Sequence, residues 1–250
     1  MELHKEYLDL ILVPCGLLIM FTYHLFLLFR YLHRPHTTVM GFENNDKSAW
    51  VERIMQASNQ LNPSILKRDV RNAVSVIQAN ITAATFLATV SLTLCSLIGA
   101  WMANSSSNVF QSQLIYGDTR SITISIKYIC LLTCFLIAFS CFVQSTRHFV
   151  HAIYLISTPD LDSPVPVSSV EMAVIRGGDF WSLGLRSLYF ALNLLLWFFG
   201  PIPMFASSLV MVVILYYLDY NSRPLHPTRS KLPKFQNPKG QIYKGMTGTI

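Results

Sequence analysis

Long uncharged, apolar runs alternate with charged segments along this chain. The longest run extends from residue 187 to residue 218 and contains no Asp, Glu, Lys or Arg. As one helix it would be about 48 Å long, whereas the hydrocarbon core of a bilayer is about 30 Å thick. We therefore place a helix break at Gly200, Pro201 and Pro203, which separates two spans. The alternative is one long last helix that is kinked at this proline-rich site.

Three further apolar runs precede the longest one. Together they predict an all-α fold, a polytopic bundle of five transmembrane helices, or of four if the last helix is kinked. We expect residues 1–220 to form this single transmembrane domain. The expected spans are residues 10–29, 79–102, 128–143, 181–199 and 202–218.

Two segments lie outside these spans. Residues 48–61 carry apolar side chains at spacings of three and four, among them Trp50, Val51 and Ile54. This pattern predicts either an interfacial helix with Trp50 at the level of the lipid headgroups or an ordinary helix packed under the bundle. Residues 221–250 hold prolines and cations without any acid, so we expect a disordered tail that contacts anionic lipid or a partner.

The distribution of charge predicts the orientation. Charged residues are 13% of the chain, about half the usual share in soluble proteins. The formal net charge is +6, and seven Lys or Arg lie between Arg30 and Arg71 and six between Arg223 and Lys244. Because cations collect on the cytoplasmic side, both regions are expected there, with the N-terminus outside, and this favours five spans. The cations lie beside spans, which is typical of anionic lipid as a partner rather than nucleic acid.

Smaller signals agree with an integral protein of the plasma membrane or an endomembrane. The acidic residues before the first span do not fit a cleavable signal peptide, so we expect this span to be retained. Asn104 begins a glycosylation sequon in the loop that we expect outside. All five cysteines lie in apolar runs, which argues against an extracellular disulfide framework.

A stripe of hydroxyl groups runs along one face of the second span. Because lipid does not favour polar groups, we expect this face to contact other helices. Its purpose is either close helix packing or the lining of a polar path. The stripe contains Thr82, Thr85, Thr89, Thr93 and Ser96.

Four more polar residues lie in or beside the third and fourth spans and could line such a path or pack between helices. They are Lys127, His148, Arg186 and Asn193. Ionisable and amide groups are costly at membrane depth and tend to face partners inside a bundle. Lys127 and Arg186 lie near span ends and could instead extend to the interface. Asn193 and His24 lie deeper, where this explanation is weaker.

Several motifs resemble those of a known family. They are Arg71-Asn72, the AATFLAT segment at residues 83–89, and Arg186 followed by YFAL at 189–192 and WFFGPIP at 197–203. The chain is similar here to a family of multi-spanning membrane proteins, abundant in plants and also found in bacteria, catalogued as a domain of unknown function. The resemblance covers most of the chain except the basic tail. It implies a plant-like membrane protein and supplies no reaction, substrate or catalytic residue.

Signatures of hydrolases, nucleotide-binding loops and zinc proteases are absent from the sequence, so we predict no catalytic residue, cofactor or metal site. Our first functional hypothesis is a small channel, carrier or exporter-like protein for an ion or polar solute. The alternative is a non-enzymatic adaptor that uses the interfacial helix and the basic tail. A His-ligated membrane redox enzyme ranks last. Besides the lipid bilayer, a second copy of the chain is a candidate partner.

Overall fold

The computed structural model describes residues 3–58, 63–104, 120–157 and 165–220. In these residues the chain forms six α-helices, a single-turn 3₁₀ helix and no strand, which confirms the all-α prediction. The elements are α1 (Leu3–His33), η1 (Pro35–Thr37), α2 (Val39–Ser58), α3 (Pro63–Asn104), α4 (Ser121–Ser157), α5 (Val167–Leu196) and α6 (Pro201–Asp219).

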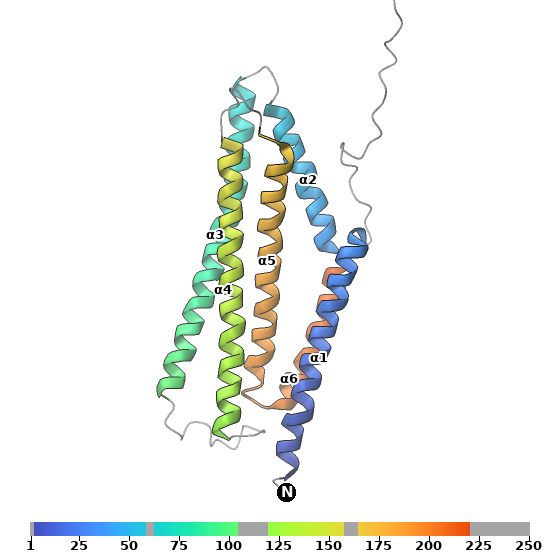
Figure 1. Ribbon diagram of the computed structural model, residues 1–250, viewed down its shortest axis with the longest axis vertical. Helices are drawn as coiled ribbons and strands as arrows, with labels where there is room; N and C mark the ends of the chain where they lie inside the picture. Colours follow the sequence, from blue (N-terminus) through green and yellow to red (C-terminus); the bar gives the residue numbers. More distant parts are fainter. Residues whose placement is uncertain (1–2, 59–62, 105–119, 158–164, 221–250) are drawn as a thin grey trace, which may run out of the picture.

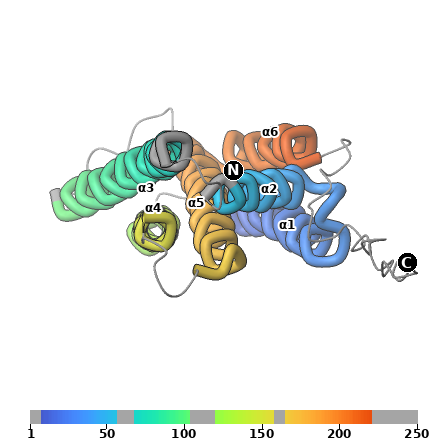
Figure 2. The backbone as a smooth tube through the Cα atoms, turned by 90° about the horizontal axis from the view of Figure 1, so that it is seen from above, coloured from blue at the N-terminus to red at the C-terminus, as the bar shows by residue number. Residues whose placement is uncertain are grey.

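Figure 1 shows α1, α3, α4, α5 and α6 running along the longest axis, while α2 continues from the upper end of α1 and lies beside α5. Seen from above, α5 lies between the α3–α4 pair and the α1–α6 pair (Figure 2). Helix α5 therefore contacts elements on both sides of the bundle, and its polar residues can reach partners on several of them.

The expected helix break at Gly200 and Pro201 is present. Helix α5 ends at Leu196 and α6 begins at Pro201, while Gly200 has a φ of 137°, a conformation that glycine adopts without steric cost. Pro201 and Pro203 lie in the first turn of α6, where an N–H has no intrahelical acceptor to lose. The chain reverses here, since Arg186 of α5 pairs with Asp219 at the far end of α6. The alternative of one kinked last helix is therefore wrong.

Four helices are long and apolar enough to cross a membrane, which suggests an integral membrane protein. They comprise residues Leu8–His33, Arg68–Ala103, Ser121–Ser157 and Pro201–Asp219. This count differs from the expected five, because α5, which contains the predicted span 181–199, is not among them. Helix α5 carries Glu171, Arg176, Asp179 and Arg186, which lower its mean hydropathy, yet it runs alongside α4 through the bundle (Figure 1).

Helix α2 begins at Val39, nine residues before the expected start at residue 48, and ends at Ser58, so residues 59–61 lie outside the described part. It packs its apolar side against the bundle: Val51 is 1% exposed and lies in a cluster with Ile77 of α3, Phe149 of α4 and Val170 of α5. The expected apolar face is thus used inside the protein. The position of α2 at a membrane surface stays a prediction.

Glycines set the distance between α4 and α5. A Cβ at Gly177 would lie 2.7 Å from the Phe149 ring, and a Cβ at Gly184 would lie 2.7 Å from the Phe142 ring. The two glycines are seven residues apart on α5, and the two phenylalanines are seven apart on the antiparallel α4. Between them, the buried Ser145 hydroxyl donates to the Gly177 carbonyl at 2.7 Å. Small residues let the backbones approach, and the rings fix the register.

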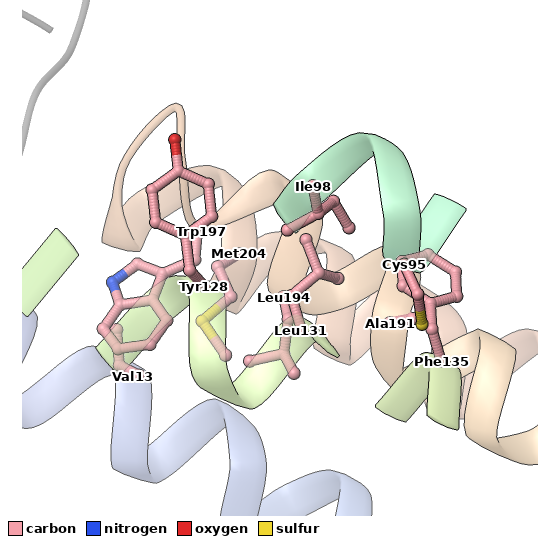
Figure 3. Packing of buried hydrophobic residues seen from close by; sticks show 10 residues of the cluster. All are labelled: Val13, Cys95, Ile98, Tyr128, Leu131, Phe135, Ala191, Leu194, Trp197 and Met204. Atoms are coloured by element: carbon pink, nitrogen blue, oxygen red, sulfur yellow. The ribbon is translucent and has the colours of Figure 1, made fainter. Parts of the chain in front are cut away.

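A second part of the core lies near the turn after α5. Trp197, Tyr128 and Leu131 pack there with Met204 of α6 and Val13 of α1 (Figure 3). This cluster joins α1, α4, α5 and α6 at the end of the bundle where the chain reverses.

Candidate functional site

The hydroxyl stripe of α3 lies on the surface of the part of the chain that the structure describes. All five of its residues (Thr82, Thr85, Thr89, Thr93 and Ser96) are exposed, whereas the face packed toward α4 holds small and apolar residues such as Ala84 and Ala88. Four of the five hydroxyls donate to the backbone carbonyl four residues earlier, as Thr89 does to Thr85. These groups are satisfied within α3. The expectation that the stripe faces other helices is therefore not met within one chain.

A different line of polar groups runs through the bundle on α5. Asp179, Arg186 and Asn193 follow one another at intervals of seven residues, and Trp197 comes four residues later. These intervals place them near one face of the helix. Each of the four hydrogen-bonds to another helix, and we call them the α5 polar line.

Arg186 forms the centre of this line. Its guanidinium donates to both carboxylate oxygens of Asp219 at 2.8 and 3.2 Å, and each side chain is 17% exposed. The hydroxyl of Tyr23 on α1 donates to the same carboxylate at 2.7 Å. A two-point guanidinium–carboxylate pair is among the stronger polar contacts. This group connects α1, α5 and α6 at one level.

His24 lies beside Tyr23 and has one nitrogen unpaired. Nδ1 is 2.7 Å from the Met20 carbonyl, which can only accept, so Nδ1 carries a proton. The buried Nε2 has no hydrogen-bond partner among the described residues. The His24 ring packs on Phe190, and with Arg186 it lines a mostly apolar cavity of about 290 Å³ between α1 and α5.

Asn193 is 1% exposed and lies closer to the turn. Its Oδ1 accepts a hydrogen bond from the Ser207 hydroxyl of α6. Its Nδ2 is buried without a partner in the part of the chain that the structure describes. An unsatisfied buried donor is costly, so this amide is poised to bind a further acceptor.

The end of the line contains three buried groups. The Trp197 indole donates to Asp9 of α1 at 2.8 Å, and the Lys127 ammonium of α4 donates to the Trp197 carbonyl at 3.2 Å. The same ammonium lies 5.1 Å from the Trp197 ring centre. Lys127 is only 3% exposed. It binds the negative end of the α5 helix dipole.

At the other end, Asp179 contacts α2. The buried Asn44 amide donates to Asp179 at 2.9 Å and to the Tyr31 hydroxyl at 3.1 Å, and its oxygen accepts from Lys47 at 3.1 Å. A Cβ at Gly178 would lie 2.4 Å from the Lys47 nitrogen, so this glycine makes room for the ammonium.

Comparison with known proteins identifies the family of this chain. A family model described as "Protein of unknown function, DUF599" matches residues 11–224. The chain belongs to this family. The match extends from α1 to just beyond α6, so it includes the α5 polar line and every partner named above except Asp9. No curated protein and no solved structure matches the chain.

The other features singled out in the sequence lie away from the α5 polar line. His148 stacks on Phe180, whereas His24 packs on Phe190. These aromatic residues are ten positions apart on α5, or about 15 Å along its axis, so the two histidines do not face each other as axial ligands of one haem would. In the described residues no group of three or more His, Cys, Asp or Glu could hold a metal ion. The sequon after Asn104 and the basic tail lie outside those residues.

The sequence indicated some residues of this site but not their partners. It indicated Arg186, Asn193, Lys127 and His24, but not Tyr23, Asn44, Asp179 or Asp219. One signal was available: Asp219 is the first charged residue after the long uncharged run, and a buried Arg186 requires an acid.

Proposed function

We propose that this member of the DUF599 family is a small membrane transport protein that moves a proton or another small ion along the α5 polar line. The observation that carries the proposal is the ion pair of Arg186 with Asp219. Arg186 lies ten positions before Leu196, where α5 ends, about 15 Å along the helix axis; if α5 crosses the membrane, this depth falls within a hydrocarbon core about 30 Å thick. Buried ion pairs add little to stability compared with apolar residues of the same volume. Ionisable groups at membrane depth instead mark ion pathways and proton relays.

The spacing of the polar groups supports stepwise movement. Successive members of the line are about 6 to 10 Å apart along the helix axis, too far for one direct hydrogen bond. Water or moving side chains must therefore bridge them. The unpaired atoms of His24 and Asn193 are suited to receive such water. In this proposal the Arg186–Asp219 pair opens when an ion competes for one of its members.

The proposal includes an orientation. Helices α1 and α6 are parallel, since Gly16 lies against Ser208 and Tyr23 bonds to Asp219. If both cross the membrane, the two ends of the chain lie on opposite sides. The cation-rich segments then support a cytoplasmic C-terminal tail and an N-terminus outside.

A flux measurement tests the proposal. The purified chain is reconstituted in liposomes that contain a pH-sensitive dye, and proton entry is followed after a pH jump, with potassium and chloride gradients as parallel probes. We expect Asp219→Asn and Asn193→Leu each to lower flux at least tenfold, because the first removes the carboxylate that pairs with Arg186 and the second removes a member of the line. Thr89→Val, on the exposed hydroxyl stripe, is the control and should leave flux unchanged. Wild-type protein that conducts none of the three ions would contradict the proposal, as would loss of flux in the Thr89 variant alone.

The adaptor hypothesis gains less support. It relied on the apolar face of α2, and this face is occupied by residues of α3, α4 and α5. The basic tail remains available to it but lies outside the described residues.

A further inference from the structure

A large cavity lies between α4 and α5, at the end of the bundle that carries α2. Its volume is about 660 Å³, within the range of small-molecule sites. It is separate from the α5 polar line, since none of its lining residues belongs to the line or to the partners named for it. The polar residues that line it are Arg147, His148, His151, Tyr154, Ser168, Ser169 and Arg176.

The charge of this cavity is one-sided. Two arginines and two histidines line it, and no carboxylate does among the described residues. Neither Arg147 nor Arg176 forms an ion pair with any acid in the described ranges, and both are exposed. Cations that converge without counter-charges raise the local positive potential, so the cavity favours an anion.

The two helices present complementary groups. On α4, Arg147 and His151 are four residues apart and share a face. On α5, Ser168 and Ser169 belong to the first helical turn, and the residue before it, Pro166, provides no side-chain cap. The positive end of the α5 dipole and the two serine hydroxyls therefore line the same cavity as Arg147 of α4 and as Arg176, two turns further along α5.

We propose that this cavity binds a phosphate group, carried either by a small soluble ligand or by the headgroup of an anionic lipid. Two guanidinium groups and two hydroxyls suit a group with three acceptor oxygens and up to two negative charges. Val150 and Met172 add apolar lining beside the cations, which suits a ligand with an apolar portion. The site adds a ligand to the protein and does not depend on the proposed transport.

Binding is measured on the full chain with probes that distinguish a soluble phosphate ligand from the headgroup of an anionic lipid. Inorganic phosphate and inositol phosphate are titrated into the protein in detergent by calorimetry. Native mass spectrometry then counts lipids retained from phosphatidylcholine nanodiscs with and without a phosphoinositide. The test variant is Arg147→Gln with Arg176→Gln. The matched control is Arg53→Gln on α2, an exposed arginine that does not line this cavity.

We expect the double variant to lose at least tenfold in affinity, because each lost charge-assisted contact is worth about tenfold. The Arg53 control should stay within about twofold of the wild type, which is the size of a general surface-charge effect. Arg147→Lys keeps the charge but removes the planar fork, so an intermediate loss is expected. Binding of the soluble probes identifies a free phosphate ligand, and retention of phosphoinositide alone identifies a lipid headgroup. Either result supports the site.

Two results would overturn it. One is that the wild type binds none of the probes, and the other is that Arg53→Gln weakens binding as much as the double variant. Size-exclusion elution and the melting temperature of each variant establish that it is folded. If the double variant does not fold, phosphate binding is compared instead in Arg147→Lys and Ser169→Ala. Both variants retain the two positive charges, and weaker binding in them would support the site.

Discussion

At the scale of single residues, substitutions of Arg186 and Asp219 distinguish a functional role of this ion pair from a structural one. Asp219→Asn leaves the Arg186 charge buried without a counter-charge, and such losses cost about 3 to 5 kcal/mol at fully buried sites and less at this partly accessible one. Replacing both residues by apolar ones, Arg186→Met with Asp219→Leu, removes both charges and should leave stability close to the wild type.

Thermal unfolding in detergent, followed by circular dichroism, should therefore rank the single variant clearly below the double variant. The same double variant should lose proton flux, since it removes the centre of the polar line. A double variant as unstable as Asp219→Asn would mean that the pair chiefly holds the fold together. Tyr23→Phe is the milder companion, because it removes one hydrogen bond to Asp219 and leaves the ion pair intact.

At the scale of helices, the close contact of α4 and α5 depends on glycine. Gly184→Ala places a methyl group 2.7 Å from the ring of Phe142, which is fully buried and has no room to shift. Overpacking of this kind costs about 1 to 3 kcal/mol. Gly99→Ala on α3 is the matched control, since nothing lies within 4 Å of its added Cβ and alanine favours a helix. We expect the melting temperature to fall for the first variant and to stay or rise for the second.

The helices also show which of their faces could be predicted from the sequence. Periodicity correctly groups Thr82 to Ser96 on one face of α3, but it does not say which way that face points. Ala84 and Ala88 on the opposite face allow a closer approach to α4, and the threonines can satisfy their hydroxyls on their own helix, so the small face is buried. On α5 the spacing of Arg186 and Asn193 was visible in the sequence. Their partners were not, because they come from α1 and α6 through contacts between distant positions.

At the scale of the whole molecule, the packing accounts for the charged residues that make α5 less apolar than the four candidate spans. Its charged residues are costly in lipid only if they face lipid, and Asp179 and Arg186 instead bond to side chains of α2 and α6. The turn at Gly200 was predictable from a local motif, whereas the central place of α5 between two helix pairs depends on the complete packing. An apolarity criterion therefore finds four helices, although a fifth of similar length runs through the same bundle.

The proposed orientation makes a prediction about this whole arrangement. Five traverses would put the sequon at Asn104 and the C-terminal tail on opposite sides of the membrane. On expression in microsomes, the wild type should carry a glycan that Asn104→Gln removes, seen as a shift in gel mobility that glycosidase abolishes. A second sequon engineered into the tail should remain unmodified. If α5 lay outside the membrane and only four helices crossed it, the tail would share the side of Asn104 and its sequon would be glycosylated too. In that case Arg186 and Asp219 would lie outside the hydrocarbon core, and the main reason to assign them to an ion pathway would be lost.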